Sequence, residues 1–68
     1  MDVRGPDARE QRLAMRAGLR LTRRRYGYWA AIRPADDDAV FVFRGSNAGW
    51  RDFRRFVADG LADGWLFP

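Results

Sequence analysis

The segment that decides the fold runs from Ser46 to Leu61 and reads SNAGWRDFRRFVADGL. Its large apolar side chains recur at intervals of three and four residues, which is the period of a helix with one buried face. They are Trp50, Phe53, Val57 and Leu61, with Phe56 at the edge of the same face. Ser46 or Asn47 is suited to cap this helix, and Gly60 or Gly64 to end it. We therefore expect a long amphipathic helix that packs on the preceding part of the chain.

Upstream of this helix the apolar period shortens to two, which is typical of β-strands. Three segments follow that pattern: residues 19–22, 28–32 and 39–43. A turn is expected at residues 24–27 and an acidic turn at residues 36–38. Because the connections are short, the simplest assembly is a meander of three antiparallel strands.

A first helix is expected at residues 8–17. Asp7 is placed as its N-cap with Glu10 three positions later, a capping-box pattern, and Gly18 is placed to end it. Leu13, Ala14 and Ala17 form a narrow apolar seam beside a basic stripe. That stripe consists of Arg9, Arg12 and Arg16.

The expected order of helix, three strands and helix is an α+β fold of one domain, residues 1–68. Residues 1–6 are expected to be flexible, and the apolar tail 65–68 to pack on the core. Sixty-eight residues without cysteine must bury an unusually apolar core. The residues expected to centre that core are Leu19, Leu21, Ile32, Phe53, Val57 and Leu61.

All 13 basic residues are arginine, and the formal net charge is +4. Such a balance indicates an acidic partner, either nucleic acid or an acidic protein surface. A GC-rich genome would also favour arginine over lysine, so composition alone leaves the cause open. Without histidine, cysteine or lysine the chain lacks the usual nucleophiles, bases and metal ligands. We expect a non-enzymatic protein with no cofactor and no metal, and we interpret residues 36–38 as a solvated turn.

A meander places the 24–27 turn, the end of the third strand and the start of the second helix at the same end of the sheet. Helix starts favour anions because their free N–H groups point outward. The sequence thus predicts one nucleic-acid or anion site there. Its expected residues are Arg23, Arg24, Arg25, Arg44, Ser46, Asn47 and Arg51. The alternative is that these arginines form a solvated rim that keeps the protein soluble.

A second hypothesis concerns the face of the sheet that two helices leave uncovered. Alternation along the second strand places Trp29 on the opposite side from Ile32, and we expect Trp29 to face outward. Exposed aromatic rings with arginine around them are typical of protein interfaces. The candidate interface residues are Tyr26, Trp29, Trp65 and Phe67. This face would bind a protein partner or form a homodimer.

The order of elements resembles the double-stranded-RNA-binding domain, in which the first strand connection and the start of the second helix contact the duplex backbone. The matching residues here are Arg23 to Arg25, Arg51, Arg54 and Arg55. The chain lacks that family's lysine-rich second-helix start, so the likeness rests on topology.

Residues 12–13, 16–21 and 23–28 also resemble short uncharacterised proteins of high-GC actinobacteria and their phages. That resemblance implies a phage or mobile-element origin. We therefore expect a cytoplasmic nucleic-acid-binding protein that makes backbone contacts to DNA or RNA and does not use a membrane. The alternative is a phage inhibitor of a host protein, similar to anti-CRISPR proteins.

Overall fold

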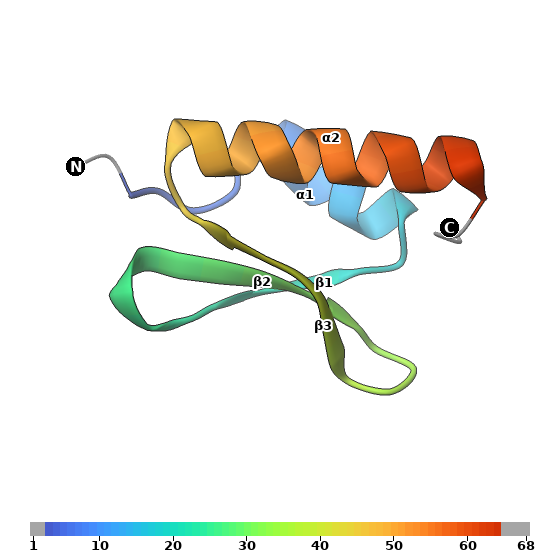
Figure 1. The fold of residues 1–68 in the computed structure, drawn as a ribbon, viewed down its shortest axis with the longest axis horizontal. Coiled ribbons are helices and arrows are strands. Elements are labelled where there is room, and N and C mark those ends of the chain that lie inside the picture. The colour runs from blue at the N-terminus through green and yellow to red at the C-terminus, as the bar shows by residue number, and fades with distance from the viewer. Residues whose placement is uncertain (1–2, 65–68) are drawn as a thin grey trace.

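The computed structural model describes residues 3–64, and it has the element order that the sequence predicts. Its helices and strands are α1 (Ala8–Arg16), β1 (Arg20–Arg23), η1 (Arg25–Gly27), β2 (Tyr28–Arg33), β3 (Asp38–Arg44) and α2 (Asn47–Asp63). The strands form one antiparallel sheet in the order β1-β2-β3. Both helices lie on the same face of that sheet (Figure 1). The predicted α+β fold, with helices flanking a three-stranded meander, is confirmed.

The ends of both helices carry the caps that the sequence indicates. Asp7 and Glu10 form the expected capping box at α1, and Gly18, which follows the helix, has a φ of 68°. Ser46 caps α2 by accepting a hydrogen bond from the Gly49 amide at 3.1 Å. Gly64 ends α2 with a left-handed φ of 80°. In the part of the chain that the structure describes, no helix is long and apolar enough to cross a membrane.

The core lies between α2 and the inner face of the sheet. Trp50, Phe53 and Val57 are fully buried, as the helical period predicts. Phe43 of β3 packs between two of them, with ring centroids 4.8 Å from Trp50 and 5.2 Å from Phe53. Leu19 belongs to the same buried cluster. Leu21 and Leu61, also expected in the core, are partly buried against it.

The predicted orientation of β2 is wrong. Trp29 faces α2, with its ring centroid 5.5 Å from that of Trp50, and it pairs across the sheet with Phe43. Ile32 is buried, but it lies outside the core cluster and belongs to the other face. Alternation divides a strand into two sets without saying which set faces the helices. The inward orientation of Trp29 uses the space beside Gly45, where a Cβ would lie 2.8 Å from Cδ1 of Trp29.

Arg4 lies within residues 1–6, for which the sequence predicts flexibility, and it makes backbone contacts with the end of β3 and with α2. The Arg4 amide donates to the Gly45 carbonyl at 2.6 Å, and the Arg4 carbonyl accepts from Nε1 of Trp50 at 2.8 Å. Arg4 therefore ties this segment to the end of β3 and to the first turn of α2. The predicted packing of the tail 65–68, with Trp65 and Phe67, lies outside the described residues.

Candidate nucleic-acid interface

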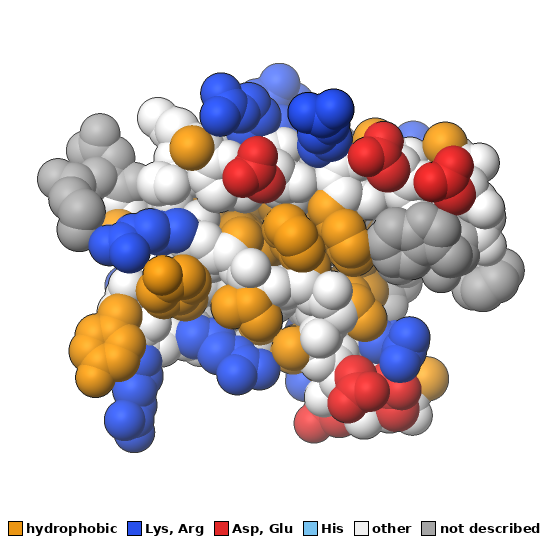
Figure 2. Space-filling view, in the orientation of Figure 1, with side chains coloured by type: hydrophobic (Ala, Val, Ile, Leu, Met, Phe, Trp, Pro, Cys, Tyr) orange, Lys and Arg blue, Asp and Glu red, His pale blue; other side chains and the backbone are white. Residues whose placement is uncertain are grey.

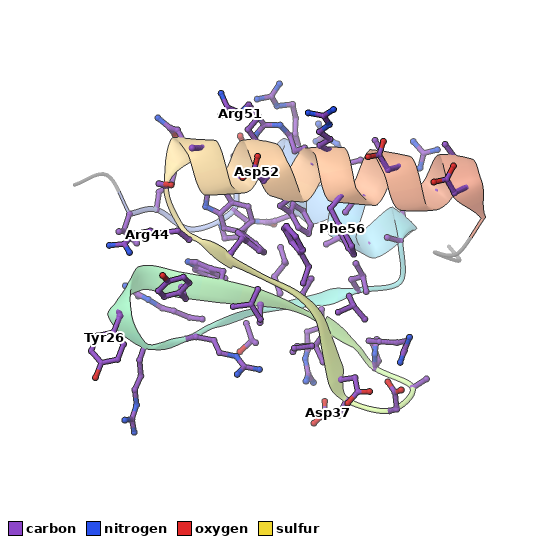
Figure 3. All side chains as sticks on the ribbon, viewed as in Figure 1. Tyr26, Asp37, Arg44, Arg51, Asp52 and Phe56 are labelled. Carbon is purple, nitrogen blue, oxygen red and sulfur yellow. The ribbon has the colours of Figure 1, made fainter. Side chains whose placement is uncertain are left out.

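The sheet has two chemically different ends. At one end the β1–β2 connection meets the exit of β3, since the Gly45 amide donates to the Gly27 carbonyl at 2.8 Å. At the other end lies the β2–β3 turn, with three consecutive aspartates. Figure 3 shows Tyr26 and Asp37 at these opposite ends. The topology argument from the sequence therefore placed the two connections correctly.

An open groove lies at the first end. It has a volume of about 620 Å³ and is lined by Arg23, Arg24, Arg25, Tyr28 and Val42. We call it the hairpin groove. The sequence predicts the three arginines there, but it does not predict that an aromatic ring and an aliphatic side chain share the groove with them.

The apolar wall of the hairpin groove belongs to the face of the sheet that the helices leave uncovered. Tyr28 and Val42 alternate with Trp29 and Phe43, which pack on α2, so they point the opposite way. Tyr28 is 39% exposed and Val42 52% exposed. An open groove with charged and apolar walls suits a ligand that is itself partly charged and partly flat.

Arg44 lies beside this wall. It is the cross-strand partner of Tyr28, and its guanidinium carbon lies 5.5 Å from the centroid of the Tyr28 ring. A guanidinium over a ring face is a cation–π contact that orients the planar cation. Arg44 is thus associated with the hairpin groove, as the sequence predicts.

The charges of the sheet are segregated between its two ends. Arg33 contacts Asp36 at 2.6 Å, and Arg20 contacts Asp37 at 2.7 Å, so the acidic turn is largely neutralised by its own arginines. The Arg33 hydrogen bonds hold the pKa of Asp36 at about 2, below its usual value. Across residues 3–64, by contrast, no carboxylate lies within ion-pair distance of Arg23, Arg24 or Arg25. Figure 2 shows a group of acidic side chains gathered at one end of the sheet.

Tyr26 stands at the tip of the β1–β2 connection. It is 84% exposed, and its backbone is left-handed, with φ 61° and ψ 30°. Gly27 follows with a φ of 77°, and the Arg24 amide closes the turn on the Tyr28 carbonyl at 2.7 Å. Figure 3 shows the Tyr26 ring pointing away from the sheet and the helices. The sequence singles out Tyr26, but nothing in it reveals the left-handed backbone.

The start of α2 does not join the hairpin groove in the way the sequence predicts. The Ser46 hydroxyl is used as the helix cap, and Oδ1 of Asn47 accepts from Nε of Arg4 at 3.0 Å. Arg51 projects from the side of α2 that faces away from the sheet (Figure 3). Of the seven residues expected to converge, Arg23, Arg24, Arg25 and Arg44 are brought together. Ser46 and Asn47 are engaged elsewhere, and Arg51 lies on another face.

The second basic stripe is a separate surface. Arg9, Arg12 and Arg16 lie along α1 and, with Leu13, line a shallow groove of about 360 Å³. Arg9 lies 3.8 Å from Asp7. Among residues 3–64, no aromatic side chain lines this groove, which distinguishes it from the hairpin groove.

Glu10, which the sequence predicts only as part of a helix cap, is a buried charged residue. Glu10 is fully buried and accepts hydrogen bonds from Arg4 at 2.8 Å, from the Asp7 amide at 2.9 Å and from Arg54 of α2. Burial alone raises the pKa of this carboxyl, but the hydrogen bonds from Arg4, the Asp7 amide and Arg54 outweigh it and lower the pKa to about 2. The capping-box pattern indicated Glu10, whereas no local pattern indicates an ion pair with a residue as distant as Arg54. This cluster is satisfied internally, so it is structural.

Comparison with known protein families, with curated proteins and with solved structures finds no match to this chain. Within residues 3–64, no group of three or more histidine, cysteine, aspartate or glutamate side chains could hold a metal ion.

Proposed function

We propose that this protein is a non-enzymatic nucleic-acid-binding protein whose hairpin groove grips the phosphate backbone. The observation that carries the proposal is the set of exposed arginines Arg23, Arg24 and Arg25 around one open groove, with no carboxylate of residues 3–64 within ion-pair distance of them. Guanidinium groups bind phosphate oxygens with paired hydrogen bonds. Such contacts read the backbone and give little sequence preference.

The alternative that these arginines are a solvated rim predicts no particular relation between basic and acidic residues. Arg4, Arg9, Arg20, Arg33 and Arg54 all contact carboxylates of the chain itself. Within residues 3–64, the three arginines of the hairpin groove have no such carboxylate partner. Arg12 and Arg16 of α1 have none either, so what distinguishes Arg23, Arg24 and Arg25 is that they are consecutive and share one groove with Tyr28 and Val42.

The resemblance to the double-stranded-RNA-binding domain supports the same element as the contact site. In that family the first strand connection contacts the duplex backbone, and here that connection carries Arg24 and Arg25. The second matching region fits less well, because Arg54 is committed to Glu10 and Arg51 projects away from the sheet. The β1–β2 connection is therefore the part of the resemblance on which the proposal relies.

The alternative function, inhibition of a host protein through an aromatic sheet face, is weakened. Trp29, one of the two tryptophans assigned to that interface, packs on Trp50 instead. The side chains that remain exposed near the hairpin are Tyr26, Tyr28 and Val42, and arginines flank them. An acidic protein surface is the partner that would compete with nucleic acid for this region.

The test is fluorescence anisotropy of end-labelled oligonucleotides at several salt concentrations. Replacing Arg24 and Arg25 together by alanine should weaken binding and reduce the slope of log affinity against log salt by roughly one to two units. The matched control replaces Arg12 and Arg16 by alanine, which removes the same charge from α1. An equal loss in both double variants would mean that net charge alone drives binding, and it would refute the hairpin groove as the site. Absence of binding by the unchanged protein at low salt would refute the function.

A further inference from the structure

Tyr26 is placed where the fold gains little from a tyrosine. Its ring is largely exposed, and its left-handed backbone is a conformation that glycine or asparagine adopts more readily than an aromatic residue. The adjacent Gly27 shows that the turn already contains a residue suited to positive φ. An exposed aromatic ring on a strained backbone at a loop tip points to a role in binding.

A second ring lies at the same end of the sheet. Tyr28 forms part of the hairpin groove, and Arg44 is held over its face at 5.5 Å. Both a tyrosine ring and a guanidinium plane are surfaces on which nucleobases stack. Val42 extends this wall with an apolar side chain.

Only unpaired bases can use such rings. In a duplex the faces of the bases are covered by their neighbours. A duplex would therefore contact the arginines of the hairpin groove without stacking on Tyr26 or Tyr28. A single strand presents phosphates and base faces together, and positively charged grooves with aromatic side chains are the general way in which proteins bind it.

We propose that the ligand of the hairpin groove is single-stranded nucleic acid, with bases stacked on Tyr26 and Tyr28 and phosphates held by Arg23, Arg24 and Arg25. This inference rests on the proposed function and narrows it to one class of ligand. Because every base has a flat face, binding should tolerate most sequences. The described lining of the groove on α1 has arginines and no aromatic ring, so this groove should not discriminate between single strands and duplexes.

The experiment compares labelled dT12 and U12 with a hairpin duplex that has the same number of phosphates, using the full chain. The unchanged protein should bind the two single strands more tightly than the duplex, and the ratio of dT12 to U12 affinity reports on preference for DNA or RNA. Tyr26→Gly removes the ring in a conformation that suits glycine, so the fold should be retained or stabilised. We expect this variant to lose about tenfold in affinity for the single strands, with little change for the duplex.

Two further variants keep the test decisive. Tyr26→Phe retains the ring and should retain single-strand affinity, whereas Tyr28→Ala should weaken it. Unchanged single-strand affinity in both Tyr26→Gly and Tyr28→Ala would overturn the inference, and so would tighter binding of the duplex. If the Arg24 and Arg25 double variant still weakened binding in that case, the proposed function would stand without the stacking. If that double variant had no effect either, the proposed function would fail as well.

Discussion

Glu10 gives the sharpest prediction about stability, because one carboxylate joins three parts of the chain. The Glu10 carboxylate accepts hydrogen bonds from Arg4 of the N-terminal segment and from Arg54 of α2, and it completes the capping box of α1. The pKa of this buried group falls from 4.5 in its ordinary state to about 2 in the folded protein. A folded-state pKa below the unfolded one means that the ionised group stabilises the fold.

The ordinary and folded-state pKa values of Glu10 set the pH range over which its carboxylate stabilises the fold. The stabilisation is fully present above about pH 4.5 and is lost as the pH falls through the folded-state value of about 2. The difference in pKa corresponds to about 3 kcal/mol. A domain of this size has a free energy of unfolding of only roughly 3 to 10 kcal/mol. We therefore expect acid to remove a large fraction of the stability, or to unfold the protein.

Urea unfolding followed by tryptophan fluorescence between pH 6 and pH 2 measures this loss, since Trp50 is fully buried in the folded state. The pKa of the exposed Asp36 is lowered in the same range by Arg33, so Asp36→Asn serves as the control. This variant should retain most of the acid-induced loss. A flat profile in the unchanged protein, or a loss that disappears in Asp36→Asn, would refute the assignment to Glu10.

Further predictions concern the contacts between α2 and the sheet. Gly49→Ala should destabilise the fold by about 3 kcal/mol, because its new Cβ would lie 1.7 Å from the Arg44 carbonyl oxygen and α2 would have to shift. Thermal unfolding measures this, with Ala48→Gly as a neighbouring control, and an unchanged melting temperature would contradict the close approach. Trp29→Glu should cost at least about 3 kcal/mol, since it removes a ring packed on Trp50 and places a charge beside the core. A Trp29→Glu protein that folded normally and lost only a partner would restore the outward-facing interpretation of β2.

The features that the sequence predicted correctly are local ones. The caps at Asp7 and Ser46 depend on residues three positions apart, and the helical face of α2 on repeats of three and four. The features it missed depend on contacts between distant segments. Trp29 packs into the space beside Gly45, and the Arg4 carbonyl accepts a hydrogen bond from Trp50 of α2. No window of the sequence contains both sides of such a contact.

The candidate site was predictable to the extent that it follows from topology. A meander places the β1–β2 connection and the exit of β3 together, and Gly27 and Gly45 are indeed hydrogen bonded. Topology does not predict where Arg51 lies. This residue is near the start of α2, but whether it reaches the hairpin groove depends on the direction in which its side chain points. It follows the buried Trp50, and one residue of helical rotation turns it away from the sheet.

The separation of charge between the two ends of the sheet also has a consequence for how a ligand would approach. Asp36, Asp37 and Asp38 lie at the end opposite Tyr26, where Arg20 and Arg33 neutralise most of their charge, so this end attracts a polyanion less than the hairpin end does. The arginines of the hairpin groove attract the same polyanion at the other end. Such a field orients the protein before contact and raises the rate of productive encounters, most strongly at low ionic strength. A strand guided to the hairpin end would therefore meet the Tyr26 ring and the hairpin groove before any acidic surface.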